Sequence, residues 1–341
     1  MAHNPVGITG FDFIEFSSPK PEALDILFKK LGFSKLKRHK TKKIDYYRQN
    51  DIHFLVNAEP GSFAHSFHSL HGPCANATGW RVENAQKAFE VAVQRGAKVA
   101  TSKDYDVPAI QGVGESLIYF IDSYQSKDRW EKFGFVDLEK PELVPSKGFA
   151  LVDHLTNNVH KGELLPLADF YKDVFGFEEV RYFDIRGQET GLKSYALRSP
   201  CGSFCIPINE GTEDKSQINE YLREYKGPGI QHIALICSNI LEVMEKMKVE
   251  GLKTLDIDAD YYDSVFKRLP QVKEDKEKIK DFNLLVDGDE SGYLIQIFTE
   301  NVIGPIFFEF IQRNLHLGFG EGNFGALFRA IERDQKRRGV L

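Results

Sequence analysis

Two histidines and one glutamate in the second half of the chain have the types and spacing of a metal site. They are His154 in VDHLTNNV, His232 in GIQHIAL and Glu309 in IFFEFIQR. They are separated by 78 residues (154 to 232) and 77 residues (232 to 309), and each lies in an apolar stretch typical of a β-strand. Two neutral imidazole nitrogens and one carboxylate can occupy one face of an octahedral ferrous ion and leave three positions for substrate and oxygen. The three residues therefore predict an oxygenase.

Each of these residues also has a simpler interpretation. A single histidine on an apolar strand is most often a hydrogen-bonded core or edge residue, because histidine is intermediate in burial. Glu309 is harder to explain in this way, since it is flanked by Phe308 and Phe310. A carboxylate among apolar residues is costly to bury unless it is paired or bound to a metal. The three residues together therefore favour a metal site more strongly than any one of them.

A rival metal site is the run AHSFHSLHG. It places His65, His68 and His71 at intervals of three, near one face of a helix. No carboxylate accompanies them, and Ser, Gly and Pro residues surround them. This composition favours a solvated helix or loop over a metal site.

Length and composition define the class of protein. At 341 residues, with 42% hydrophobic and 28% charged residues, the chain is long enough for two globular domains. The net charge of −6 gives no reason to expect nucleic acid or an anionic membrane as a partner. No apolar run approaches the ~20 residues of a membrane span, and the start of the chain lacks a signal-peptide pattern. We expect a cytoplasmic protein.

An internal repeat indicates the architecture. Asn84 and Asn239 each suit a helix N-cap, and each is followed 12 residues later by a glycine, Gly96 or Gly251, that suits the helix end. The two segments are 155 residues apart (84 to 239). The helical segments 27–33 and 170–177, each ending in Gly-Phe, form a second matching pair. The pattern predicts four βαβββ-like modules arranged as two halves, with curled mixed sheets and the helices outside.

The segment EKPELVPSKG (139–148) has the composition of a linker. We therefore expect domains at 1–145 and 146–341. Aligning the two halves puts Phe13 opposite His154, and Ala77 opposite His232. The first half thus lacks these ligands, which indicates that the second half holds the chemistry and that the first serves packing or assembly.

Eight short strings, taken in order, resemble the 4-hydroxyphenylpyruvate dioxygenase family. The similarity spans nearly the whole chain and is densest between about 150 and 330. The strings are VDHLTNNV (152–159), GLKS (191–194), PINE (207–210), KSQI (215–218), GPGIQHIAL (227–235), QIFT (296–299), FFEFIQR (307–313) and GFGEGNF (318–324).

The resemblance implies a fold of two vicinal-oxygen-chelate domains. Each would be an open, curved β-barrel of two βαβββ modules, and a C-terminal helix would close over the second one. The family would bind one Fe(II) per subunit through the residues matching His154, His232 and Glu309. It also implies a homo-oligomer, either a dimer or a tetramer.

The resemblance further implies the residues of the substrate pocket. Residues two apart on a strand share a face, which independently groups Phe307 with Glu309, Gln296 with Phe298, and Pro207 with Asn209. The residues implied to act in catalysis are Gln231, Gln296 and Phe298. Those implied to bind substrate are Ser194, Pro207, Asn209, Gln217, Phe307, Phe319, Asn323, Phe324 and Leu327.

The implied reaction belongs to tyrosine and phenylalanine catabolism: 4-hydroxyphenylpyruvate and O2 give homogentisate and CO2. Two alternatives stay open. A 4-hydroxymandelate synthase uses the same substrate and iron but hydroxylates the benzylic carbon, and a non-catalytic protein of this fold binds a ligand without turnover. The bulk of Phe298 favours attack on the ring, and the retention of all three metal-ligating residues argues against the non-catalytic reading.

Overall fold

The computed structural model describes residues 3–187 and 189–341 and divides them between two eight-stranded sheets. The first half contains β1 (Ile8–Ser17), α1 (Pro21–Lys30), β2 (Ser34–His39), β3 (Ile44–Gln49), β4 (Ile52–Asn57), α2 (Phe63–His71), β5 (Cys74–Val82), α3 (Ala85–Gln94), β6 (Ala109–Gln111), η1 (Val113–Glu115), β7 (Leu117–Ile121), α4 (Arg129–Lys132) and β8 (Phe135–Glu142).

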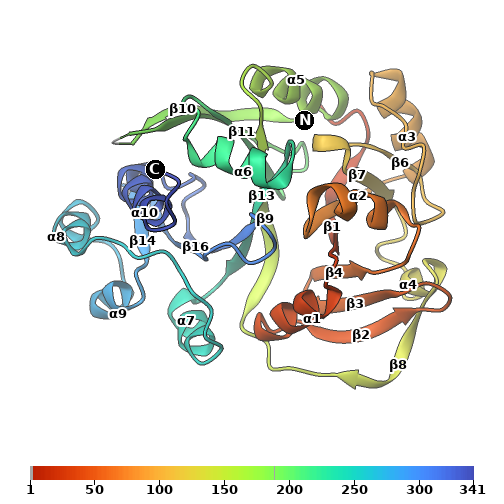
Figure 1. Cartoon of the computed structure of the whole chain (residues 1–341), viewed down its shortest axis with the longest axis horizontal. Coiled ribbons are helices and arrows are strands. Elements are labelled where there is room, and N and C mark those ends of the chain that lie inside the picture. Colours follow the sequence, from red (N-terminus) through yellow and green to blue (C-terminus); the bar gives the residue numbers. More distant parts are fainter. Residues whose placement is uncertain (1–2, 188) are drawn as a thin grey trace.

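The second half repeats this order and adds helices. It contains β9 (Phe149–Val159), α5 (Leu164–Phe175), β10 (Glu178–Arg186), β11 (Gly191–Arg198), β12 (Cys205–Gly211), α6 (Gln217–Tyr225), β13 (Gly229–Cys237), α7 (Ile240–Lys248), α8 (Ala259–Arg268), α9 (Lys276–Asp281), β14 (Leu285–Asp289), β15 (Gly292–Phe298), β16 (Phe307–Asn314), η2 (Glu321–Asn323) and α10 (Phe324–Arg337). Figure 1 shows the halves side by side, with α10 lying within the curve of the second half.

The strand orders confirm the repeat. The first sheet runs β6-β7-β5-β1-β4-β3-β2-β8. The second sheet, read from its other edge, runs β14-β15-β16-β13-β9-β12-β11-β10, so that β7-β5-β1-β4-β3-β2 matches β16-β13-β9-β12-β11-β10. In both sheets the first strand of the half (β1 or β9) pairs antiparallel with the strand that opens its second module (β5 or β13). Those strands pair in turn with a parallel strand, β7 or β16. The prediction of mixed sheets built from βαβββ modules is confirmed.

The two helices that revealed the repeat are capped as their sequences predict. Asn84 accepts a hydrogen bond from the backbone N–H of Lys87 before α3, and Asn239 accepts one from Glu242 before α7. Gly96 and Gly251 follow these helices with φ values of 102° and 68°. This left-handed region favours glycine, which explains its presence at both ends.

The halves are joined through a shared apolar core. Trp80 on β5 packs against Phe175 of the second half, with ring centroids 4.9 Å apart, and Phe54 lies 6.2 Å from Phe308. The linker is also held in place, because the Gln49 side-chain oxygen accepts hydrogen bonds from the backbone N–H groups of Lys147 and Gly148 at 2.8 and 3.0 Å. These contacts fix the two halves against each other.

Two local expectations need correction. The linker composition at 139–148 begins inside β8, which continues to Glu142 and pairs with β2. The helix containing His65, His68 and His71 is present as α2, but His68 and His71 are buried rather than solvated. His71 is within hydrogen-bonding distance of the Tyr225 carbonyl, at 2.7 Å, because this face of α2 packs on the second half.

No helix in the described part of the chain is long and apolar enough to cross a membrane.

Candidate metal centre and adjoining cavity

The three predicted ligands lie on three neighbouring strands in the middle of the second sheet. Ala234 on β13 pairs with His154 on β9 on one side and with Glu309 on β16 on the other. His232 is two residues before Ala234, and residues two apart share a face of a strand. The register therefore brings all three side chains to the same face, and all three are buried.

The ligand atoms of these side chains form a compact triangle. His154 Nε2 lies 3.0 Å from Glu309 Oε2 and 3.3 Å from His232 Nε2, and the third side, from His232 Nε2 to Glu309 Oε2, is 3.4 Å. An octahedral ion with ligands at roughly 2.1 Å places neighbouring ligand atoms about 3 Å apart. The nitrogen and oxygen donors also suit a divalent transition metal. The residues present thus fit one ion, and they are the one cluster of this kind in the described residues.

The electrostatics of the cluster also suit a cation. Burial alone would raise the pKa of Glu309, but the two imidazoles hold it at about 2, so the carboxylate stays ionised. Burial would lower the pKa of His154, yet Glu309 and Asp153 raise it to about 9. The carboxylates therefore attract a positive charge to this point, and a bound metal would replace the proton on Nε2 of His154, the nitrogen that faces Glu309.

Further contacts hold His232. Its Nδ1 lies 3.0 Å from Gln231 Oε1, and its Nε2 lies 3.0 Å from the hydroxyl of Thr156. The ring of Phe307 stacks on the imidazole with centroids 4.9 Å apart. Thr156 was not among the sequence predictions, although its place two residues after His154 on the same strand face could have suggested it.

A cavity of about 160 Å³ adjoins the cluster. Its volume is close to that of the ~150 Å³ engineered cavity that accommodates benzene, so one substituted aromatic ring fits. All the predicted pocket residues except two are in its wall: Ser194, Pro207, Asn209, Gln217, Gln231, Phe298, Phe307, Phe319, Phe324 and Leu327. Phe183, Ile185 and Leu192, on β10 and β11, also line it but were not predicted.

The remaining two residues, Gln296 and Asn323, are not in the wall of the cavity. Gln296 shares a strand face with Phe298, as expected, but the segment before η2 covers it. A Cβ atom added at Gly320 would come within 2.3 Å of Gln296 Nε2. Asn323 is fully buried and accepts a 2.6 Å hydrogen bond from the Tyr261 hydroxyl. Both residues therefore contribute to seating the C-terminal segment.

The first half has no such cluster at the equivalent positions. On its three equivalent strands, Phe13 pairs with Gly79, and Gly79 pairs with Tyr119. These positions correspond to His154, Ala234 and Glu309 in the second half. Ala77, two residues before Gly79, takes the place of His232. The register thus agrees with the sequence alignment at Phe13 and Ala77 and adds Tyr119 as the third counterpart.

Two family models and several relatives match this chain over most of its length. Residues 2–139 match the family model described as "Hydroxyphenylpyruvate dioxygenase, HPPD, N-terminal", and residues 153–297 match that of the "Glyoxalase/Bleomycin resistance protein/Dioxygenase superfamily". The chain is 56% identical to "Protein MelA" of Shewanella colwelliana, over 99% of both chains. It is 44% identical to a 4-hydroxyphenylpyruvate dioxygenase of Legionella pneumophila, over 99% of this chain and 98% of the relative.

Solved structures show the same fold. A fusion protein of a xylose isomerase-like TIM barrel and 4-hydroxyphenylpyruvate dioxygenase aligns with a TM-score of 0.83 and 29% identity, over 97% of this chain and 54% of the fusion. This chain therefore spans about half of that protein. A mutant of 4-hydroxymandelate synthase from Streptomyces coelicolor aligns with a TM-score of 0.82 and 24% identity, over 96% of this chain and 99% of the other. At that identity, the second match supports the fold alone.

Proposed function

The chain belongs to the 4-hydroxyphenylpyruvate dioxygenase family, and from this we propose that it converts 4-hydroxyphenylpyruvate and O2 to homogentisate and CO2. The observation that carries the proposal is the buried His154–His232–Glu309 cluster opening on a cavity the size of one aromatic ring. Membership of the family makes the chain a dioxygenase, while the identity of the product belongs to the proposal.

We assign one Fe(II) per subunit to the cluster. The donor set by itself accepts several divalent ions, so the family provides the reason to choose iron. When bound, Fe(II) would supply an open coordination face for the 2-oxo acid and the electrons that activate O2. Glu309 would supply the negative charge that balances the ion, and His154 and His232 would supply neutral nitrogen donors.

The cavity wall would bind and orient the substrate. Phe298, Phe307 and Phe319 come from three different segments around the cavity and give it an apolar surface for the ring. The wall also includes amide side chains from β12 and β13: Asn209 Nδ2 is 3.5 Å from Gln231 Oε1. Such amides can orient the hydroxyl and oxo groups of the substrate while the aromatic residues exclude water.

The proposal also covers the roles of the two halves, the oligomeric state, the location and the metabolic role of the protein. We assign residues 1–145 to packing and assembly, and residues 146–341 to catalysis, with α10 as the closing helix. A homo-oligomer of two or four copies, a cytoplasmic location and a role in tyrosine and phenylalanine breakdown are likewise proposed. The support for these comes from the family resemblance and from the composition of the chain.

Product identification tests the reaction. The purified protein, loaded anaerobically with Fe(II), is mixed with 4-hydroxyphenylpyruvate and O2, and the products are separated and identified. We expect homogentisate and one CO2 per O2 consumed. Formation of 4-hydroxymandelate would instead assign the benzylic hydroxylation, and binding of substrate with no O2 uptake would indicate a non-catalytic ligand-binding protein.

A further inference from the structure

Asp153 occupies an unusual place on the strand that carries His154. In the pairing of β9 with β13, Val152 faces Leu235, and His154 faces Ala234, so that Asp153 is left without a partner. This is a β-bulge, which redirects a side chain relative to the regular alternation of a strand. The bulge allows the Asp153 carboxylate to lie beside the neighbouring imidazole, with Oδ2 2.7 Å from His154 Nδ1.

Asp153 is held in turn by Arg313, four residues after Glu309. Arg313 Nε donates to Asp153 Oδ1, and Nη2 donates to Oδ2, both at 2.8 Å. Such a two-point contact fixes the orientation of a carboxylate as well as its position. The three groups form a chain in which the guanidinium orients the carboxylate and the carboxylate orients the imidazole.

The same guanidinium also contacts the C-terminal segment. Arg313 Nη1 donates to the carbonyl oxygens of His316 and Gly318, at 3.1 and 2.7 Å. The next residue, Phe319, lines the cavity, and its ring meets the His154 ring edge-on at 5.7 Å between centroids. Arg313 therefore lies between the cluster and the segment that closes the cavity.

We infer that Asp153 and Arg313 are positioning residues: Asp153 holds His154 with its proton on Nδ1 and Nε2 free for the metal, and Arg313 couples this arrangement to the seating of residues 316–319. The inference rests on the proposed metal site. A carboxylate that accepts the second N–H of a metal-bound histidine fixes the tautomer and ring orientation, and its loss typically lowers metal affinity 10- to 100-fold.

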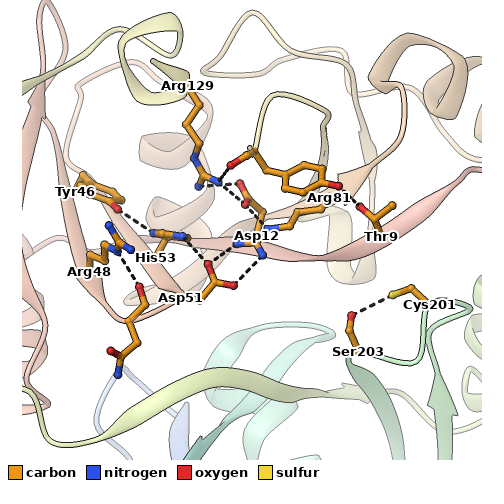
Figure 2. A network of polar contacts seen from close by, with 12 residues as sticks. Thr9, Asp12, Tyr46, Arg48, Asp51, His53, Arg81, Arg129, Cys201 and Ser203 are labelled. Carbon is orange, nitrogen blue, oxygen red and sulfur yellow. Dashed lines mark hydrogen bonds and ion pairs between the residues drawn. The ribbon is translucent and has the colours of Figure 1, made fainter. Parts of the chain in front are cut away.

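The first half provides a matched control. Its pairing leaves Asp12 unpaired between Phe11 and Phe13, as Asp153 is between Val152 and His154. Figure 2 shows Asp12 contacting the guanidinium groups of Arg81 and Arg129, which donate to it at 2.8 and 3.0 Å. The bulge and the Asp–Arg pair are thus present in both halves, but Phe13 has no nitrogen for Asp12 to orient.

The test compares Asp153→Asn with Asp12→Asn. The dissociation constant of Co(II) is measured anaerobically for each full-length variant without substrate. We expect Asp153→Asn to weaken Co(II) binding by about 10-fold or more, and Asp12→Asn to leave it within about twofold of wild type. Unchanged affinity in Asp153→Asn, or an equal loss in both variants, would overturn the inference.

Two further measurements complete the test. If Asp153→Asn does not fold, the imidazole tautomer is read from the ¹H–¹⁵N spectrum of the Zn(II)-loaded wild type. A proton on Nδ1 of His154 supports the inference, and one on Nε2 overturns it. In Arg313→Lys, we expect the KM for 4-hydroxyphenylpyruvate to rise while Co(II) binding weakens less than in Asp153→Asn; wild-type values of both would refute the role of Arg313.

These measurements separate the inference from the proposed reaction. Metal affinity and tautomer are determined without turnover, so they can fail while homogentisate is formed. Conversely, an unexpected product from the wild type would overturn the proposed reaction and leave the positioning of His154 intact.

Discussion

The two halves of the molecule share a strand arrangement and differ in what fills the space beside the central strands. In the second half, His154, His232 and Glu309 border a cavity. In the first half, a closed apolar cluster surrounds Phe13, whose ring contacts those of Tyr105, Tyr119, Trp130 and Phe133. The scaffold therefore does not depend on the polar cluster, because aromatic packing fills the same place in the first half.

Two of the buried carboxyl groups, Glu15 in the first half and Glu309 in the second, have opposite environments. Glu15 is fully buried; burial and the nearby Asp104 raise its pKa to about 7, although Tyr105 and Asn76 donate hydrogen bonds to it. Glu309 faces two imidazoles that hold its pKa at about 2. The same burial therefore gives a carboxyl that readily keeps its proton in one half, and an ionised carboxylate that suits a metal in the other.

The largest expected effect comes from removing a ligand in the second half. In His232→Ala, turnover of 4-hydroxyphenylpyruvate should fall by more than the ~100-fold typical of losing a residue that only supports a ligand. The fold should persist, since the first half has Ala77 at the matching position. Oxygen uptake and circular dichroism check the two expectations. Near-normal turnover in this variant would contradict the claim that the ligands of the second half carry the chemistry.

Shortening the central aromatic side chain of the first half should affect stability and not chemistry. Phe13→Ala removes a buried ring and should cost about 3–5 kcal/mol in the free energy of unfolding. Phe307→Ala, next to the cavity, should lower kcat/KM but cost less stability, because Phe307 is only half-buried. Urea denaturation and steady-state kinetics measure the two effects. A lower kcat/KM in Phe13→Ala, with the larger loss of stability in Phe307→Ala, would show that the first half contributes to the reaction.

The buried carboxyl of the first half should make stability depend on pH. With its pKa raised from 4.5 to about 7, folded Glu15 keeps its proton where the unfolded chain releases it. Stability should therefore fall as pH rises from about 4.5 to 7, by about 3 kcal/mol, because each pKa unit corresponds to ~1.4 kcal/mol. Glu15→Gln should remove this dependence. The check is the difference in unfolding free energy between variant and wild type at several pH values; a difference independent of pH would contradict the account.

The smallest effect is expected at the counterpart of Glu309. Tyr119→Phe loses one hydrogen bond, in which the Asp104 backbone N–H donates to the Tyr119 hydroxyl at 3.0 Å. The cost should be about 1 kcal/mol, with unchanged turnover. The change of similar size at the matching position, Glu309→Gln, should abolish metal binding. Thermal unfolding and metal titration compare the two variants, and a loss of metal from Tyr119→Phe would be inconsistent with a site confined to the second half.

The sequence predicted the repeat and the metal cluster well because both depend on local patterns. Capped helices recur at a fixed offset, and ligands on adjacent central strands need only the alternation of a strand to share a face. Tyr119 was missed because the offset between the halves changes along the chain: Glu309 lies 190 residues after it (119 to 309), whereas Ala77 and His232 are 155 residues apart (77 to 232). The second half inserts α8 and α9 before β14, so a fixed offset fails there.

Other features could not be predicted because they depend on contacts between distant segments. Asp153 and Arg313 are ordinary charged residues in the sequence, and only the bulge and the pairing of strands bring them together. Gln296 lies on the predicted face but is covered by the segment around Gly320. His71 is buried because α2 packs against the second half, near Tyr225. In each case, tertiary packing overrides the local pattern.

The most direct test of the account is the stoichiometry of Fe(II) binding, measured by anaerobic titration of the full-length protein and of His232→Ala. If the second half alone holds the metal, the wild type binds one Fe(II) per chain, and the variant binds none tightly. Two ions per chain, or one that remains equally tight in His232→Ala, would contradict the assignment of the site to His154, His232 and Glu309.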